Sequence, residues 1–397
     1  MTLLLKGGTV VASEHSGNGV KNDVLIKDSV IKEIGENLEI SSDTQIIDCT
    51  GLTILPGIFD MHVHLRDPGQ TYKEDLQSGT NAAATGGVTG LLCMPNTTPV
   101  IDTPETVQNI IERSYNKKLK SKIYVCGAIT HSLKGEKLTD FAVLKKAGAI
   151  AISDDGMPVV SDDFMSKAMQ NAKTEGLAII SHCEPENEMT AREVRLAKEL
   201  GVPVHIAHVS TKVALSSIQT AISEGAKITY EIAPHHFTLT KTDCVDADYK
   251  MNPPLREPED VQAMLQTLIS GEADCIASDH APHSPEEKQS SEPPNGVLGL
   301  ETLLPITLTR LFHKDNVSLE RIVELLCVNP RKILGISGGT IKVGETADLA
   351  IVDLNQSWIV NPDKLQSKSR NTCFKGMELK GKIKYTVLDG KVVYKDG

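Results

Sequence analysis

The chain has 397 residues, enough for one large domain and a smaller one. Hydrophobic residues make up 40% and charged residues 23%, which excludes a disordered or fibrous chain. The net charge of -11 argues against nucleic acid or an anionic membrane as a partner. We expect no signal peptide and no membrane span, because the first residues lack a basic start and no apolar run approaches roughly 20 residues. Eight scattered cysteines without a CxxC pair predict reduced thiols and a cytoplasmic protein.

The start of the chain alternates apolar and polar residues in the manner of antiparallel strands. These strands are expected at residues 3–11, 23–34 and 45–48, with turns at Gly7-Gly8 and Lys27-Asp28. Similar strands are expected near the other end of the chain, at 339–343, 348–353 and 382–394. There Asp389-Gly390 is a strong hairpin turn. Residues 1–53 and 338–397 are therefore expected to form one small β-sandwich domain.

Between these ends, short apolar strands alternate with amphipathic helices. The strands are expected at 54–64, 88–96, 122–130, 149–155, 178–184, 202–209, 227–236 and 274–280. The clearest helices are expected at 104–116, 162–175, 211–224 and 257–270, with Thr103, Ser161 and Ser210 as N-caps. Eight such units predict a (β/α)8 barrel over residues 54–337. A doubly wound open sheet is the alternative, but no G-x-G-x-x-G follows the first strand.

Five of the eight strands end in residues that bind metal ions. The ends read His62-Val63-His64, Ser153-Asp154-Asp155-Gly156, Ser181-His182-Cys183-Glu184, His205-Ile206-Ala207-His208 and Ser278-Asp279-His280. In a parallel barrel these ends open on one rim, so their side chains converge. Each histidine alone is more often structural, but four histidines with two carboxylates suit two zinc-like ions that share a carboxylate. Arg66 lies on the same face as His62 and His64, where its guanidinium can bind a carboxylate.

The chain resembles the long bacterial dihydroorotases of the amidohydrolase superfamily. The resemblance rests on seven motifs in the expected order: His62-Val-His-Leu-Arg-Asp-Pro-Gly69, Met94-Pro-Asn-Thr97, Ser153-Asp-Asp-Gly156, His182-Cys-Glu184, His208-Val-Ser-Thr211, Met251-Asn-Pro-Pro-Leu-Arg256 and Ser278-Asp-His-Ala-Pro-His283. It implies a TIM-barrel hydrolase of pyrimidine biosynthesis that reversibly cyclises N-carbamoyl-L-aspartate to L-dihydroorotate. Its partner is then a small molecule, and both a homodimer and an association with aspartate transcarbamoylase stay open.

The same resemblance implies a site with two zinc ions. His62, His64 and Asp279 bind one ion, His182 and His208 bind the other, and a carboxylate bridges them. Many relatives use a carbamylated lysine as the bridge, where this chain has Asp154-Asp155. The family pattern points to Asp155, and because adjacent strand residues face opposite ways only one of the two can point inward. A register shift of one residue would exchange them.

The implied chemistry is the attack of a metal-bridging hydroxide on the ring carbonyl, with Asp279 as general acid and base. In the alternative, Asp279 is only a ligand and water is the base. For the substrate, the resemblance implies contacts from His64, Arg66, Asn96, Asn252, His283, Asn295 and Gly296. The last two belong to a loop, 284–296, in which many relatives carry Phe-Gly instead.

Other histidines are expected to have supporting roles. His280 is expected to pack or to donate a hydrogen bond, His235 and His236 to be structural, and His205 to face the helices because it is out of phase with His208. The segment between Glu184 and Glu193 is shorter than is usual in the family.

Two further readings of the sequence stay open. The first is another cyclic amidohydrolase, such as a dihydropyrimidinase, hydantoinase or allantoinase. The missing lysine bridge and the presence of Arg66 and Asn96 argue against it. The second is a non-catalytic barrel that serves aspartate transcarbamoylase, against which the full set of ligands argues.

Overall fold

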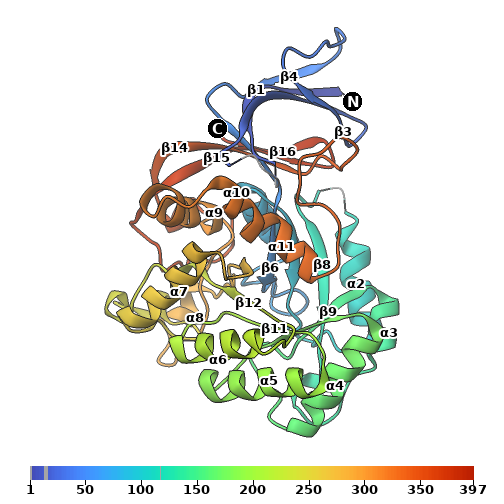
Figure 1. Ribbon diagram of the computed structural model, residues 1–397, viewed down its shortest axis with the longest axis vertical. Helices are drawn as coiled ribbons and strands as arrows, with labels where there is room; N and C mark the ends of the chain where they lie inside the picture. The colour runs from blue at the N-terminus through green and yellow to red at the C-terminus, as the bar shows by residue number, and fades with distance from the viewer. Residues whose placement is uncertain (1, 13–16, 117) are drawn as a thin grey trace.

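Two β-sheets organise the chain, one in a barrel surrounded by helices and one that lies beside the barrel, at the top in Figure 1. The computed structural model describes residues 2–12, 17–116 and 118–397. The barrel strands follow one another in sequence order: β6 (Ile58–Val63), β7 (Val88–Cys93), β8 (Lys122–Gly127), β9 (Ala149–Ile152), β10 (Ala178–Ser181), β11 (Val204–Ile206), β12 (Ile228–Ile232) and β13 (Cys275–Ile276). All neighbouring pairs are parallel, as the sequence predicts.

The ends of this ladder meet through three contacts between the first and last strands. Val63 forms a parallel bridge with His280, and the amide of His64 donates to the carbonyl oxygen of His280 at 2.8 Å. Lower down, the amide of Ser278 donates to Asp60 Oδ1 at 3.0 Å. Apolar side chains from the barrel strands, among them Met61, Leu92 and Ile180, fill the interior of the barrel. The expected barrel is therefore confirmed.

Helices cover the outside of the barrel (Figure 1). They are α1 (Leu76–Thr85), α2 (Pro104–Ser114), α3 (Phe141–Ala147), α4 (Asp162–Glu175), α5 (Glu186–Leu200), α6 (Lys212–Ser223), α7 (Pro258–Ser270), α8 (Pro285–Lys288), α9 (Leu303–Thr307), α10 (Leu319–Val323) and α11 (Asn329–Ile333). Thr103 and Ser161 cap α2 and α4 as predicted. The cap of α6 is Thr211 rather than Ser210, because the Thr211 hydroxyl reaches the amide of Ala214.

The second sheet combines strands from both ends of the chain. Its members are β1 (Thr2–Val10), β2 (Val20–Lys27), β3 (Val30–Gly35), β4 (Gln45–Asp48), β5 (Thr53–Pro56), β14 (Leu349–Ile359), β15 (Glu378–Leu388) and β16 (Lys391–Lys395). It encloses its own core, in which Leu3, Ile26 and Ile54 meet Leu349 and Val387. Asp389 and Gly390 turn the β15–β16 hairpin with φ angles of +48° and +72°, as the Asp-Gly pair predicts. The expected β-sandwich from both termini is thus confirmed, while the boundaries at 53/54 and 337/338 stay predictions.

Three local expectations about these strands are wrong. The strand expected at 54–64 is divided, because β5 pairs in the terminal sheet and the chain passes at Gly57 into β6 of the barrel. Gly7-Gly8 is not a turn but an irregularity within β1, where the register shifts. Residues 339–343 are not in a strand. In each case pairing with a distant segment decides the conformation, and local alternation does not report it.

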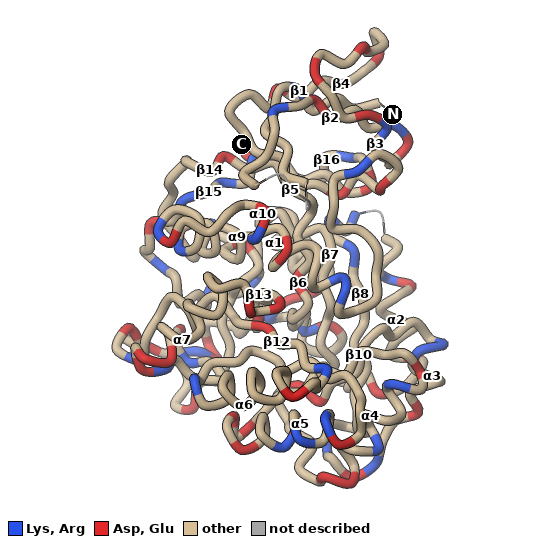
Figure 2. The backbone as a smooth tube through the Cα atoms, in the orientation of Figure 1, with Lys and Arg blue, Asp and Glu red and all other residues tan. Residues whose placement is uncertain are grey.

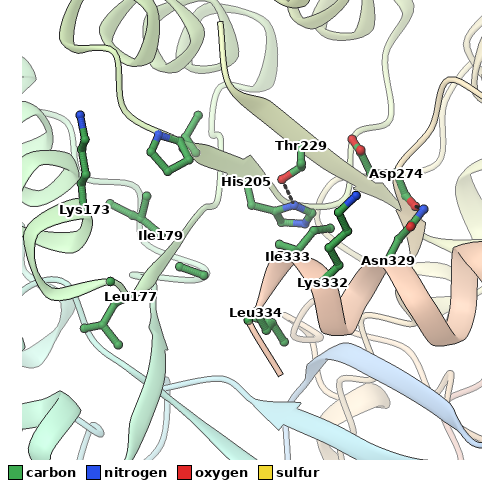
Figure 3. A pocket seen from close by; sticks show the side chains of 15 residues that line it. Lys173, Leu177, Ile179, His205, Thr229, Asp274, Asn329, Lys332, Ile333 and Leu334 are labelled. Atoms are coloured by element: carbon green, nitrogen blue, oxygen red, sulfur yellow. Dashed lines mark hydrogen bonds between the residues drawn. The ribbon is translucent and has the colours of Figure 1, made fainter. Parts of the chain in front are cut away.

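The expectation that His205 faces the helices is also wrong. Its side chain faces the barrel interior, where Nδ1 lies 2.9 Å from Thr229 Oγ1, and it borders a cavity of about 660 Å³ at the amino-terminal end of the strands (Figure 3). The predicted alternation fails because β11 ends at Ile206 and His208 adopts a φ of +34°. His205 and His208 therefore do not belong to one regular strand.

Basic and acidic residues are interspersed along the helices and loops of the chain (Figure 2). Several form ion pairs between neighbouring helices, such as Arg195 with Asp162 at 2.6 Å and Lys198 with Glu224 at 2.7 Å. Among the described residues, no helix combines the length and the apolar character that a membrane span requires.

Substitution of Asp60 tests how the first and last strands of the barrel are joined. Its Oδ1 atom is buried and accepts from the amides of both Ser278 and His62. Asp60→Leu leaves both amides without an acceptor, so we expect a loss of about 1–3 kcal/mol in the free energy of unfolding. Asp60→Asn keeps an acceptor oxygen and should lose less. Urea unfolding in the presence of EDTA measures the difference, and equal losses in both variants would contradict this role.

Candidate metal centre and substrate cavity

A cavity of about 210 Å³ opens at the carboxyl ends of the barrel strands. Its wall contains every residue predicted for the site except His62, namely His64, Arg66, Asn96, Asp155, His182, His208, Asn252, Asp279, His283, Asn295 and Gly296. His62 is fully buried next to this wall, with Nε2 3.2 Å from Asp155 Oδ1. The structure therefore brings all the predicted residues together, from strands and loops far apart in the sequence.

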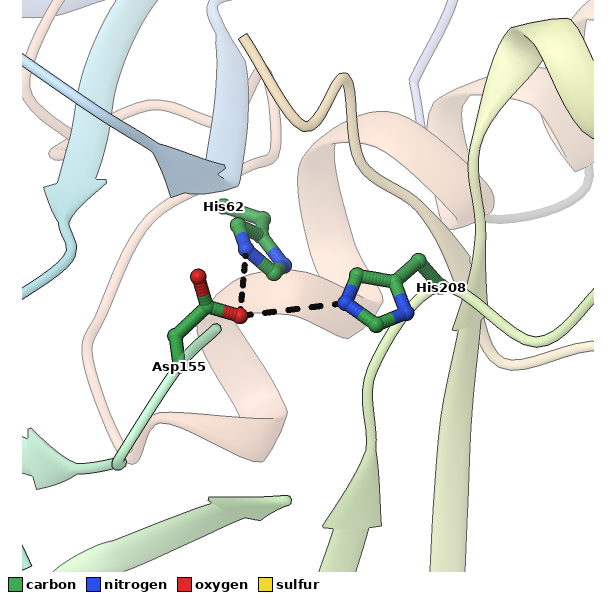
Figure 4. A group of neighbouring side chains, drawn as sticks. All are labelled: His62, Asp155 and His208. Carbon is green, nitrogen blue, oxygen red and sulfur yellow. Dashed lines mark ion pairs between the residues drawn. The ribbon is translucent and has the colours of Figure 1, made fainter. Parts of the chain in front are cut away.

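Asp155 faces four histidines, of which Figure 4 shows His62 and His208. Its Oδ1 atom is 3.2 Å from His62 Nε2, 3.4 Å from His182 Nδ1 and 3.7 Å from His208 Nε2, and its Oδ2 atom is 3.4 Å from His64 Nε2. Burial alone would raise the pKa of Asp155, but the histidines, with His62 first, lower it well below its usual value. One ionised carboxylate thus faces four imidazoles.

Asp279 is the second carboxylate of the cluster. Its Oδ1 atom lies 3.3 Å from His64 Nε2 and 3.6 Å from His62 Nε2. Burial opposes ionisation, but the hydrogen bond with His64 and the nearby imidazole charges lower its pKa below the usual range. Asp279 is consequently an anion at neutral pH and can accept a proton.

Asp154, the neighbour of Asp155, lies outside this cluster. It accepts hydrogen bonds from the amide of Thr130 at 3.0 Å and from the Thr130 hydroxyl. Burial raises its pKa to about 6. Asp155 is therefore the carboxylate that faces the histidines, and Asp154 orders the loop after β8.

The cluster has the properties of a cation site. The ligand atoms of His62, His64 and Asp279 lie within 4.8 Å of one another, and so do those of His62, Asp155 and His208. Among the described residues, His62 Nε2 and Asp155 Oδ1 are buried and have no hydrogen-bond partner. Although burial disfavours a charged imidazole, Asp155 and Glu231 raise the pKa of His62 well above its usual value. The field at this point favours a positive charge, so the donor set fits metal ions.

Hydrogen bonds at Nδ1 fix the tautomers of two histidines, His62 and His64. His62 Nδ1 donates to Glu231 Oε1 at 2.6 Å, and His64 Nδ1 donates to Asn96 Oδ1 at 2.7 Å. Each contact leaves the Nε2 lone pair directed at the carboxylates, as metal ligation requires. Glu231 is not among the residues predicted from the sequence. A charged residue within the apolar strand Ile228–Ile232 was the signal that could have revealed it.

Glu231 also belongs to a third group of potential ligands, with His205 and Cys275. Its Oε1 atom is occupied by His62, and its Oε2 atom lies 3.4 Å from His205 Nε2. Burial raises the pKa of Cys275 well above its usual value, which keeps it a thiol. This group is a hydrogen-bonded support for His62 rather than a metal centre.

Arg66 brings a cation to the cavity wall. Its Nε atom donates to the carbonyl oxygen of Pro282 at 3.1 Å, and its Nη2 atom lies 3.2 Å from His283 Nε2. Burial lowers the pKa of Arg66 to about 10, so the guanidinium stays charged at neutral pH. Burial and the charges of Arg66 and Lys73 lower the pKa of His283 to about 3, which keeps that imidazole neutral. The wall therefore offers one fixed positive charge to an anionic ligand.

The backbone is strained at three of these positions. Arg66, His208 and Asp279 have φ angles of +57°, +34° and +49°, a region that residues with a side chain seldom adopt. Such strain is typical of functional sites, where the surrounding structure imposes a side-chain direction. Here it turns three strand ends toward the same cavity.

Three further histidines, His280, His235 and His236, lie outside the cavity wall. His280 Nδ1 accepts from the amide of Gly299 at 3.1 Å, and its Nε2 atom lies 3.4 Å from Glu74. His236 Nε2 lies 3.1 Å from the carbonyl oxygen of Pro253. Burial lowers the pKa of His235 to about 4. The contacts of His280 and His236 agree with the supporting roles expected for them, while the structural role of His235 stays a prediction.

Known proteins resemble this chain over its whole length. The model of the Amidohydrolase family matches residues 53–393. A dihydroorotase from Acetivibrio thermocellus is 41% identical over 425 residues, covering 99% of both chains. A dihydroorotase from Geobacter metallireducens is 42% identical over 427 residues, and one from Aquifex aeolicus is 40% identical over 425, each covering 100% of both chains. These alignments are longer than the 397 residues of this chain, so the relatives carry residues that it lacks.

Solved structures with the same fold are named hydantoinases and dihydropyrimidinases. L-Hydantoinase (dihydropyrimidinase) from Arthrobacter aurescens superposes with a TM-score of 0.88 at 27% identity, covering 100% of this chain and 96% of that one. A dihydropyrimidinase from Brevibacillus agri, at 23% identity, shares the fold with a TM-score of 0.89, covering 100% of this chain and 95% of that one. The chain therefore belongs to the amidohydrolase family and, within it, to the dihydroorotases.

Proposed function

We propose that this protein is a zinc-dependent dihydroorotase that interconverts N-carbamoyl-L-aspartate and L-dihydroorotate in pyrimidine biosynthesis. The observation that carries the proposal is the position of Arg66 in the same small cavity as the cluster of histidines and aspartates. A cyclic amide with a carboxylate needs both parts. The eight unpaired cysteines support a cytoplasmic location.

The donor set suits two zinc ions. His62, His64 and Asp279 would hold the first, His182 and His208 the second, and Asp155 would contact both. Nitrogen and carboxylate ligands of this kind are those that zinc prefers. When bound, zinc lowers the pKa of water towards about 7 and polarises a carbonyl group.

Asp279 is placed to move the proton. As an anion beside His64, it can accept the proton of the attacking water when the ring opens, and then donate it to the leaving ring nitrogen. In the direction of ring closure it removes a proton from the carbamoyl nitrogen. In the alternative, Asp279 is only a ligand and water is the base; this role also requires Asp279 to lie beside His62 and His64.

Arg66 supplies the selection of substrate. Its guanidinium can pair with the carboxylate on the ring of dihydroorotate, with Asn96 and His283 beside it. Asn252, Asn295 and Gly296 form the rest of the wall and would contact the amide edge of the ring and close over it. Dihydrouracil has no carboxylate and would leave the buried cation of Arg66 unpaired, which is costly.

Two other functions compete. A hydantoinase or dihydropyrimidinase is favoured by the names of the solved structures, but Arg66 would have no partner there. A non-catalytic barrel associated with aspartate transcarbamoylase is disfavoured by the complete cluster. A homodimer and an association with that enzyme stay predictions.

The substrate proposal is tested by turnover of dihydroorotate, dihydrouracil and allantoin by zinc-loaded protein. We expect dihydroorotate to be preferred by at least about 100-fold in kcat/KM, because an unpaired buried cation costs a few kcal/mol. Preference for either of the other substrates would reject the proposal. Loss of activity with a chelator and its return with zinc test the metal requirement.

Asp279→Ala tests the proton transfer. We expect kcat to fall by about 10³-fold, because positioned acid–base groups contribute 10²–10⁴ in rate. At least one zinc ion should stay bound, since four histidines and Asp155 remain. Zinc analysis of the same preparation separates a lost base from a lost metal, and undiminished activity would show that another group is the base.

The bridging role is tested by comparing Asp155→Ala with Asp154→Ala. Removal of Asp155 takes away the carboxylate that faces four imidazoles, so zinc content should fall clearly below that of wild type. Removal of Asp154 breaks only the contacts with Thr130 and should leave the zinc content close to that of wild type. An equal or opposite effect on bound zinc would reject Asp155 as the bridge.

A further inference from the structure

The loop 284–296 contributes its last two residues, Asn295 and Gly296, to the cavity wall. Apart from the single turn of α8, this loop has no regular structure, so side chains must hold it in place. Gly296 has a φ of +145°, and a Cβ atom there would lie 2.6 Å from the carbonyl oxygen of Ala281. The backbone therefore packs closely at the point where it meets the cavity.

Lys288 holds this loop from beneath. Its side chain is only 5% exposed, and Nζ donates to the carbonyl oxygens of Lys250 at 3.1 Å, Pro294 at 3.0 Å and Gly296 at 2.9 Å. An ammonium has three N–H donors, and each of them has an acceptor here. The carbonyls of Pro294 and Gly296 flank Asn295, and that of Lys250 precedes Met251 and Asn252. One ammonium group therefore joins the loop 284–296 to the segment that carries Asn252.

A second side chain acts on the same peptide. Asn371 Nδ2 donates to the carbonyl oxygen of Gly296 at 2.9 Å and to that of Ala281 at 3.1 Å. Its Oδ1 atom accepts from the amide of His283 at 3.2 Å. Burial lowers the pKa of Lys288 to about 8, although Asp248 partly offsets it. A desolvated ammonium of this kind is tolerated only where its hydrogen bonds are satisfied, so the loop conformation and the Lys288 position depend on each other.

We propose that Lys288 is a positioning residue for substrate binding, which fixes residues 251–252 and 294–296 in the conformation that receives the substrate. It touches neither the substrate nor the metal ligands and acts through three backbone carbonyls. The inference rests on the proposed function, since dihydroorotate is the ligand whose binding it would affect.

The test compares Lys288→Met with Lys250→Met. Lys250 is the matched control, because its Nζ also donates to a carbonyl of this loop, that of Pro293 at 2.6 Å, but from an exposed position. Lys288→Met should raise KM for dihydroorotate by roughly tenfold, because binding must then order the loops. Its kcat should change by less than about threefold, since the acid–base and ligand residues are untouched. Lys250→Met should change neither by more than about twofold, as is usual for exposed polar contacts.

Hydrogen exchange gives a readout that needs no turnover. In the free protein, peptides covering 246–252 and 284–298 should exchange faster in Lys288→Met than in wild type and in Lys250→Met. Lys288→Gln retains two N–H donors, so its KM and its exchange rates should lie between those of wild type and Lys288→Met. If the methionine variant does not fold, Lys288→Gln is compared with wild type in its place. A fall in kcat at constant KM, or unchanged exchange, would overturn the proposal. If wild type failed to hydrolyse dihydroorotate, the proposed function would fail while exchange still decided the role of Lys288.

Discussion

The structure depends on a concentration of buried negative charge in the barrel. Asp155, Asp279 and Glu231 are all nearly inaccessible to water and lie around the same imidazoles. Burying three carboxylates together is unfavourable unless positive charge compensates them. Without an ion, a proton on His62 compensates part of this charge, and Asp155 and Glu231 therefore raise the pKa of His62. Divalent cations bound through the imidazole lone pairs, in place of those protons, compensate the same negative charge, so charge balance and catalysis both favour an occupied metal site.

The elements around the cavity divide the work between rigid and adaptable parts. His62 lies in β6, His182 directly follows β10, and Asp155 lies three residues beyond β9. Glu231 of β12 fixes the ring of His62. Loops supply the residues that distinguish one ring from another. Arg66 is held by the carbonyl of Pro282, and Asn295 and Gly296 are held by Lys288. The candidate metal ligands lie in or close after the barrel strands, while longer loops carry the residues proposed to select the substrate.

Much of this arrangement was accessible from the sequence, because the relevant signals are local. Apolar runs located all eight barrel strands, and the position of Asp155 followed from the alternation of a strand together with the family pattern. The sequence did not reveal contacts made across the fold. The role of Glu231 depends on His62, 169 positions away along the chain. The direction of His205 was mistaken because alternation ends where His208 leaves the strand, and the division at Gly57 depends on pairing with β14, from the far end of the chain.

That late pairing has a consequence for the order of folding. β5 lies between β1 and β14, and it leads directly into the first barrel strand. As the chain leaves the ribosome, all eight barrel strands emerge before β14, so the barrel can assemble while one edge of β5 still lacks its neighbour. Until β14 arrives, the backbone groups of Ile54 and Leu55 along that edge lack their partners Ile351 and Ala350. The nascent protein consequently carries an unprotected apolar strand edge throughout most of its synthesis, and the final segment of the chain ends this vulnerability to aggregation.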